Sequence, residues 1–310
     1  MKKIHGEYEG MTGKMNLYYH SDIPEKASAI VLVIHGMMEH SGRYDHIKGR
    51  LLELNMGYAA IDLPGHGRNV GEGERPGNWL ESGFDILIDE IGSLINEIKD
   101  AYGIPVILFG HSMGSFIALG TICRYGDSLK ACILSGTNDS QSPLLVKTGL
   151  VISSAIIRFM GPDHRSPLLY NLIFGSYNKR IKHVRTKFDW LSGRNDIVDE
   201  YVRDPLCGFI SSTLLYKDMA GWLMHLYDEE KLKEIPGSLP VYIFSGGSDP
   251  VGDYGKGPAG LRERLVRHGL TDVRLKIYEG NRHECLNEAN SDEVIGNVLD
   301  FCTETLGGTS

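Results

Sequence analysis

The sequence predicts an α/β fold in which a mostly parallel sheet is covered by helices on both faces. Along most of the chain, apolar runs typical of buried strands alternate with segments of helical spacing. These runs are continuous rather than alternating, as expected for parallel strands that are covered on both sides. The pattern breaks once, between about residues 137 and 236, where helical patterns occur without a convincing core strand.

The elements follow from these patterns in order. Residues 7–10 and 14–20 are predicted to form a hairpin. Residues 43–57 have helical spacing, with Gly57 expected as the C-cap. Buried strands are predicted at 29–36, 58–67, 106–110, 129–136, 241–247 and 273–280, and helices at 84–103, 113–126 and 292–306. We therefore expect one α/β core made of residues 1–137 and 236–310. A helical cap, residues 138–235, is inserted before the fifth of these strands.

Composition excludes several classes of function. The chain has 40 acidic and 32 basic residues, a net charge of −8 and no lysine- or arginine-rich block, which argues against nucleic acid as a partner. Its five cysteines are irregularly spaced and form no CxxC pair, so neither a disulfide framework nor a thiolate zinc site is expected. The first residues show no apolar run behind their lysines, and we expect a cytoplasmic protein.

The segment VILFGHSMGSF, residues 106–116, places Ser112 between Gly110 and Gly114 where a strand passes into a helix. A turn this tight crowds its own neighbours, and glycine two residues before and after the serine relieves the crowding. The start of the helix also directs free N–H groups at the same point. We therefore predict that Ser112 is a nucleophile rather than a structural serine or a helix cap.

A serine nucleophile needs a base and a group that orients the base. His283 lies on a loop just after the last predicted strand, where sites of α/β folds are found. Asp249 follows the preceding strand and is favoured as the acid, although alone it could be a turn residue before Pro250. Asp253 lies in the same loop and is the competing acid.

The tetrahedral intermediate also needs N–H donors for its oxyanion. One is expected at Met113, the residue after the nucleophile, and the other at Met37, in the loop HGMMEHSGRY after the first core strand. Neighbouring Gly36 is expected to contact substrate. His35 lies at the end of that strand, and it could be an ordinary core histidine. No metal site and no organic cofactor are expected.

Five segments, HGMMEHSGRY, AAIDLPGHGRN, GHSMGS, SGGSDPVG and YEGNRHECLNE, together resemble the monoacylglycerol lipase and lysophospholipase group of α/β hydrolases. The order Ser112, Asp249, His283 is that of the α/β-hydrolase arrangement. The resemblance implies a serine hydrolase of acyl esters with these three residues as its triad. Arg68 and Asn69 depart from the commoner GHGxS pattern, and we expect their loop to shape the mouth of the pocket.

The most apolar stretch of the chain, residues 144–162, lies in the predicted cap. It is either a buried helix or a cap helix that lines an acyl pocket, with Ile152 and Ile156 contacting substrate, and that touches a lipid surface. The expected function is hydrolysis of single-chain lipid esters such as monoacylglycerols or lysophospholipids. A peptidase, thioesterase or acyltransferase on the same triad is the alternative within enzymes, and a non-catalytic binding protein is the alternative outside them.

Overall fold

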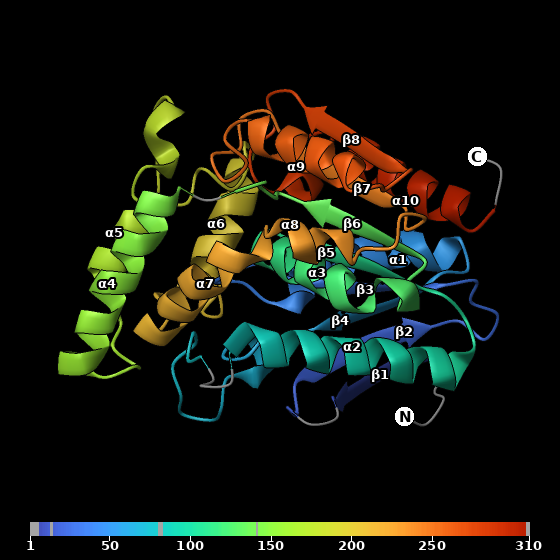
Figure 1. The fold of residues 1–310 in the computed structure, drawn as a ribbon, viewed down its shortest axis with the longest axis horizontal. Coiled ribbons are helices and arrows are strands. Elements are labelled where there is room, and N and C mark those ends of the chain that lie inside the picture. Colours follow the sequence, from blue (N-terminus) through green and yellow to red (C-terminus); the bar gives the residue numbers. More distant parts are fainter. Residues whose placement is uncertain (1–5, 13–14, 80–82, 141, 308–310) are drawn as a thin grey trace.

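The computed structural model describes residues 6–12, 15–79, 83–140 and 142–307. Its centre is an eight-stranded sheet of strand order β1-β2-β4-β3-β5-β6-β7-β8 (Figure 1). The strands β3 to β8 run parallel, whereas β1 and β2 are antiparallel and form the predicted hairpin at one edge. Their bounds are β1 Gly6–Met11, β2 Tyr18–Ile23, β3 Ile30–Ile34, β4 Gly57–Ile61, β5 Val106–His111, β6 Ala131–Ser135, β7 Val241–Gly246 and β8 Val273–Tyr278.

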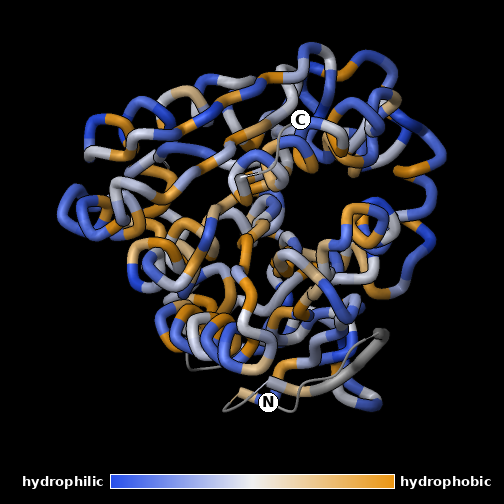
Figure 2. Tube along the Cα trace, turned by 90° about the vertical axis from the view of Figure 1, so that its right-hand side faces the viewer, coloured by the Kyte–Doolittle hydropathy of each residue, from blue (hydrophilic) through white to orange (hydrophobic). Residues whose placement is uncertain are grey.

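Helices cover both faces of this sheet because the central strands are apolar on both sides. Along β3, Ile30, Leu32 and Ile34 pack in a core with α2 (Gly83–Tyr102), α3 (Met113–Tyr125) and α9 (Lys256–Arg267). The alternate residues Val31 and Val33 pack in a second core with α1 (Asp45–Glu53) and α10 (Ser291–Thr305). Figure 2 shows hydrophobic and hydrophilic residues alternating along the coiled parts of the chain, as expected for helices with one face on a core. The predicted fold class is confirmed.

The segment between β6 and β7 holds helices α4 (Pro143–Met160), α5 (Pro167–Phe174), α6 (Asn195–Arg203), α7 (Thr213–Leu226) and α8 (Glu229–Lys233). This segment corresponds to the predicted cap, whose boundaries stay a prediction. In Figure 1, α4 and α5 lie at one end of the molecule, away from the sheet. The base of the cap is anchored on the core, because Trp222 of α7 stacks on Phe84 of α2 with ring centroids 4.7 Å apart.

Two local expectations are wrong. Gly57 does not cap a helix: α1 ends at Glu53, Asn55 takes a left-handed φ of 52°, and Gly57 is the first residue of β4. A side chain at Gly57 would crowd Ile23 and Ile30, which explains the glycine by packing instead. The alternative of a buried helix at residues 144–162 is also wrong, since only Val146 and Ser153 of α4 are buried.

Candidate active site

Ser112 lies at the turn between β5 and α3, with a φ of 54° and a ψ of −121°. A left-handed φ is strained for a residue with a side chain. A Cβ atom at Gly110 would lie 2.3 Å from the carbonyl oxygen of Gly114, and one at Gly114 would lie 2.2 Å from that of Ile34. Only glycine fits at the two flanking positions. The half-buried serine is therefore held at the tip of a turn that its neighbours make possible.

His283 and Asp249 form a buried pair at the ends of β8 and β7. The Nδ1 atom of His283 lies 2.9 Å from Oδ2 of Asp249, and the two residues are 1% and 0% exposed. The other side of the ring, Nε2, has no hydrogen-bond partner among the residues that the structure describes. In contrast, Asp253 is largely exposed and lies near Lys256, with 3.6 Å between the charged atoms. The structure thus brings Asp249, and not Asp253, to the histidine.

The surrounding charges favour the protonated form of His283. Burial lowers the pKa of its imidazole, but the Asp249 carboxylate, together with Glu284 and Glu39, raises the pKa above its ordinary value. The ring of His111 lies next to that of His283, with 4.7 Å between the centroids, and its pKa is lowered instead of raised. Burial and then the charge of His283 lower the pKa of His111 to about 4, so His111 is neutral near pH 7.

The loop between β3 and the short helix η1 (Ser41–Tyr44), residues 35–40, lies against the nucleophile, and we call it the oxyanion loop. A Cβ atom at Gly36 would lie 3.1 Å from Cβ of Ser112. The Gly36 N–H donates to the Glu39 carboxylate, which leaves the N–H of Met37 as the candidate donor on this side. Met113 is the first residue of α3, where an N–H has no partner within the helix. His35 is a buried core histidine that accepts from Leu63 N.

Four residues near this site were missed by the sequence analysis: Arg43, Glu39, Glu284 and Trp190. Arg43 is bonded to both Glu39 and Glu284, so a buried ion pair connects the oxyanion loop to the neighbour of His283. The ring of Trp190, in the cap, packs on the His283 ring with 5.1 Å between their centroids. The backbone carbonyl of Trp190 also accepts a hydrogen bond from the backbone N–H of His283. Charged residues inside otherwise buried motifs, HGMMEHSGRY and NRHECLNE, were the available signal for the ion pair.

A cavity of about 530 Å³ lies between the cap and the loop that follows β7. Apolar side chains of α4, α5 and α7 form much of its wall: Leu145, Val146, Leu169, Leu172, Ile173, Met219 and Leu223. Ile152 and Ile156 are half-buried and do not line it, although they continue the face of α4 that carries Leu145 and Gly149. Their contact with substrate stays a prediction.

Arg68 and Asn69 contact residues at the ends of strands β2 and β4 of the sheet. Asn69 accepts the Tyr18 N–H and donates to the Asp62 carbonyl, and Arg68 stacks over the Tyr18 ring. Neither belongs to the described residues that line the cap cavity. Arg68 instead lines a second pocket with His40 and Ser41, which follow β3. The expectation that this loop shapes the mouth of the substrate pocket stays a prediction.

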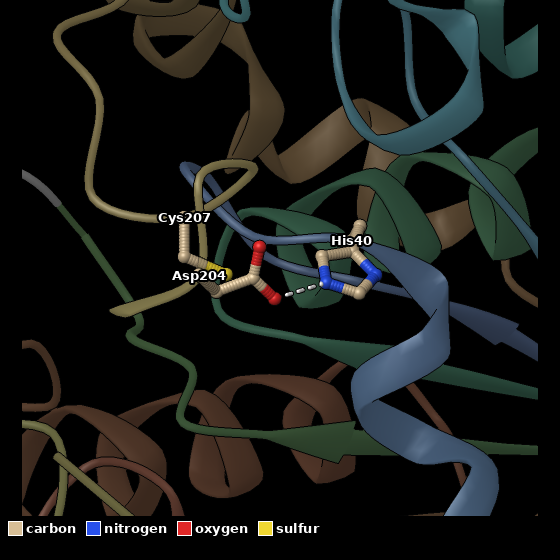
Figure 3. A group of neighbouring side chains, drawn as sticks. All are labelled: His40, Asp204 and Cys207. Carbon is tan, nitrogen blue, oxygen red and sulfur yellow. Dashed lines mark hydrogen bonds and ion pairs between the residues drawn. The ribbon is translucent and has the colours of Figure 1, made fainter. Parts of the chain in front are cut away.

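His40, Asp204 and Cys207 form a group whose potential ligand atoms lie within 4.8 Å of one another (Figure 3). Nε2 of His40 is hydrogen-bonded to Oδ2 of Asp204 at 2.9 Å, and Oδ1 of Asp204 accepts the Leu206 N–H. Burial raises the pKa of the Cys207 thiol, which favours its protonated form. The chemistry of these donors fits a hydrogen-bonded link between the oxyanion loop and the cap better than a metal centre.

Comparisons with known proteins identify the family of the chain. The family model Hydrolase_4, described as serine aminopeptidase, S33, matches residues 25–290. The chain is 26% identical over 285 residues to a monoacylglycerol lipase of Mycolicibacterium smegmatis, covering 89% of each chain. It is 29% identical over 258 residues to monoglyceride lipase of Homo sapiens, covering 82% of this chain and 75% of the human one.

Among solved structures, a carboxyl esterase of Bacillus coagulans matches with a TM-score of 0.87 and 29% identity over 99% of both chains. Together with the family model, this similarity covers the core and the cap. The chain therefore belongs to the serine aminopeptidase S33 (Hydrolase_4) family, and it is an α/β-hydrolase enzyme similar to the monoglyceride lipases.

Proposed function

We propose that the protein is a serine carboxylic-ester hydrolase that cleaves single-chain lipid esters, such as monoacylglycerols or lysophospholipids, through an acyl-enzyme. The observations that carry this proposal are the strained turn at Ser112 after β5 and the buried pair of His283 and Asp249 after β8 and β7 of the same parallel sheet. The structure has no hydrogen bond between Ser112 and His283 Nε2. Such bonds commonly tighten only when substrate is bound.

In the proposed reaction, Oγ of Ser112 attacks the ester carbonyl carbon and gives its proton to Nε2 of His283. Asp249 holds the ring in orientation and stabilises the imidazolium that forms. The N–H groups of Met37 and Met113 stabilise the oxyanion. His283 then protonates the leaving alcohol. A water molecule attacks the acyl-enzyme, giving one proton to His283, and the acid leaves as Ser112 recovers its proton.

The cap cavity supports a lipid acyl group. Aliphatic side chains of α4, α5 and α7 share its wall with polar ones such as Asn138, Asp139 and Lys256, and Ser112 and His283 are not among the described residues that line it. Each methylene moved from water to the aliphatic part of the wall contributes about 0.8 kcal/mol. The similarity to monoacylglycerol and monoglyceride lipases points to the same class of substrate. A peptidase, thioesterase or acyltransferase would use the same triad, and the description of the family model names an aminopeptidase.

The test uses a fluorophosphonate probe and a substrate panel. We expect the probe to label Ser112 and to leave Ser112→Ala unlabelled. We also expect this variant to retain its fold and to lose at least about three orders of magnitude in esterase turnover. A panel of monoacylglycerols, acyl thioesters and aminoacyl p-nitroanilides then ranks the acyl substrates, with glycerol added to detect acyl transfer. An unlabelled wild-type protein would indicate a binding protein and overturn the proposal.

We further propose that the outer face of α4 contacts a lipid surface. Leu144, Val151 and Phe159 are 76%, 71% and 81% exposed on this face. The helix is long and apolar enough to cross a membrane by length and composition, but Lys147 and Arg158 interrupt it and one side packs on α7. These features favour a helix that lies at an interface. Val151→Asp combined with Phe159→Asp should abolish co-sedimentation with phosphatidylcholine vesicles, whereas a wild-type protein that dimerises and ignores vesicles would contradict this.

We infer a cytoplasmic location from the cysteines. All five are free thiols in the structure, and four of them are buried. Such usage is typical of a reducing compartment. Fractionation of cells that express the protein tests the location.

A further inference from the structure

Arg43 is a mostly buried guanidinium that lies between two buried carboxylates. Its Nη1 atom lies 2.7 Å from Oε2 of Glu39, and Nη1 and Nη2 lie 2.6 and 2.7 Å from the two oxygens of Glu284. The side chains are 13% exposed for Arg43 and 4% for each acid. The second contact is bidentate, the arrangement that constrains geometry most strongly. Three charges in such a site are tolerated because each is paired.

The two carboxylates belong to different halves of the proposed catalytic apparatus. Glu39 is part of the oxyanion loop, and its Oε1 accepts the N–H of Gly36 and, at 2.8 Å, the hydroxyl of Tyr44. Glu284 is the neighbour of His283 in the chain, 241 residues away from Arg43. Arg43 therefore connects the loop that offers the Met37 N–H to the loop that carries the base.

The cap holds the same loop from the other side. The Arg43 guanidinium lies over the ring of Tyr201, 4.9 Å from its centroid, and the Tyr201 hydroxyl donates to the Met38 carbonyl at 2.8 Å. The Gly208 N–H donates to that same carbonyl at 2.9 Å. Met38 has a φ of 61°, which a side chain rarely adopts without support from its surroundings. The bond between His40 and Asp204 adds another link (Figure 3).

We propose that Arg43 is a positioning residue of the reaction: its bonds to Glu39 and Glu284 hold the oxyanion loop and the loop that carries His283 in place around the nucleophile. Arg43 itself reaches no reacting atom. The inference rests on the proposed serine-esterase mechanism and goes beyond it, since that mechanism needs only the triad and two N–H donors. A misplacement of about 1 Å in such a site costs about 100-fold in rate.

The decisive variant removes one whole ion pair. Arg43→Gln alone would leave two buried carboxylates without their cation, and misfolding would follow. Arg43→Gln combined with Glu284→Gln keeps the net charge of the group at −1, and Glu39 retains its donors from Gly36 and Tyr44. Arg43→Lys keeps the charge but loses the planar fork. The matched control is Arg50→Gln, an exposed arginine of α1 that lies near Asp292 on the surface.

The measurement is p-nitrophenyl butyrate hydrolysis, expressed per active site labelled to completion by a fluorophosphonate. We expect the double variant to lose about 10- to 100-fold in kcat with KM changed less than about threefold, and Arg43→Lys to fall between it and wild type. Tyr201→Phe, which removes only the bond to Met38, should lower kcat by a smaller factor. Arg50→Gln should match wild type.

A purely structural role would lower the fraction of protein that can be labelled and leave kcat per labelled site unchanged. A folded double variant with wild-type kcat per site therefore overturns the inference. If the double variant does not fold, wild-type kcat per site in both Arg43→Lys and Tyr201→Phe overturns it equally. Failure of the proposed mechanism has a different signature, namely wild-type protein that is not labelled or an active Ser112→Ala, and in that case the inference falls as well.

Discussion

Ser245 donates its hydroxyl to Oδ2 of Asp249, at 3.1 Å, the same oxygen that faces His283. The other oxygen, Oδ1, accepts the N–H of Val251 at 2.8 Å. Hydrogen bonds from Ser245 and Val251 therefore hold both oxygens of the carboxylate, independently of its contact with the imidazole. An acid held in this way can orient the ring without an added cost of reorganisation when the imidazolium forms.

This geometry predicts that activity depends far more strongly on Asp249 than on Asp253. Asp249→Asn should lower kcat by several orders of magnitude, because the amide favours the wrong tautomer of the ring and cannot stabilise its positive charge. Asp253→Asn should be mild, since Asp253 is exposed and lies near Lys256. Ester hydrolysis by both variants, compared at equal thermal stability, checks the ranking. The reverse order would move the acid to Asp253.

The pH dependence of kcat/KM should show the raised pKa of His283. The base must be neutral, so activity falls as the pH drops through this pKa, and the midpoint of the acid limb should lie above the ordinary value of about 6.5. The titratable groups facing the ring are Asp249 after β7, Glu284 beside it, Glu39 of the oxyanion loop and the neutral His111 at the end of β5.

Glu284→Gln removes one of the negative charges that stabilise the imidazolium, so it should move the midpoint of the acid limb to lower pH. The control is Glu279→Gln, which removes an exposed carboxylate four residues before His283. Full pH profiles of kcat/KM for the three proteins provide the measurement. An upward or absent shift in Glu284→Gln would show that Glu284 does not act on the base.

We expect Gly136 to tolerate no side chain, because it lies close to the imidazole ring of His283. It has a φ of 59°, and a Cβ atom there would lie 2.8 Å from Cε1 of His283. Gly136→Ala should displace the ring and lower kcat/KM by about 100-fold. Gly269→Ala shares the positive φ but has open space around it, so it isolates the backbone strain. Similar melting temperatures with similar activities in the two variants would disprove the steric argument.

Substrate preference should follow the apolar face of α4. Activity is expected to rise with acyl length up to at least about eight to ten carbons, mainly in kcat/KM. Ile152→Asp or Ile156→Asp should weaken long-chain esters and spare acetate and butyrate esters. Ser154→Asp, on an exposed face of the same helix, is the control. Uniform loss on all esters together with a lower melting temperature would refute the acyl-pocket role of these two residues.

The sequence predicted well those features that depend on neighbours in the chain. The turn at Ser112 follows from two nearby glycines, and the parallel strands follow from continuous apolar runs. The error at Gly57 arose where a glycine served packing instead of a helix end. The pairing of Arg43 with Glu284 joins residues 241 positions apart. No local pattern encodes such a partner, because only the folded sheet brings the two loops together.

The bonds between the cap and Met38 bear on how such enzymes can be recombined. Caps are attractive units for exchange between relatives, since this one is inserted between two strands of the sheet. A chimera cut at β6 and β7 would nevertheless sever the Tyr201 and Gly208 bonds to Met38 and the packing of Trp190 on His283. A transplanted cap would thus alter the chemical step together with the choice of substrate. Grafts that also carry the matching residues 38–43 should retain turnover where simple swaps lose it.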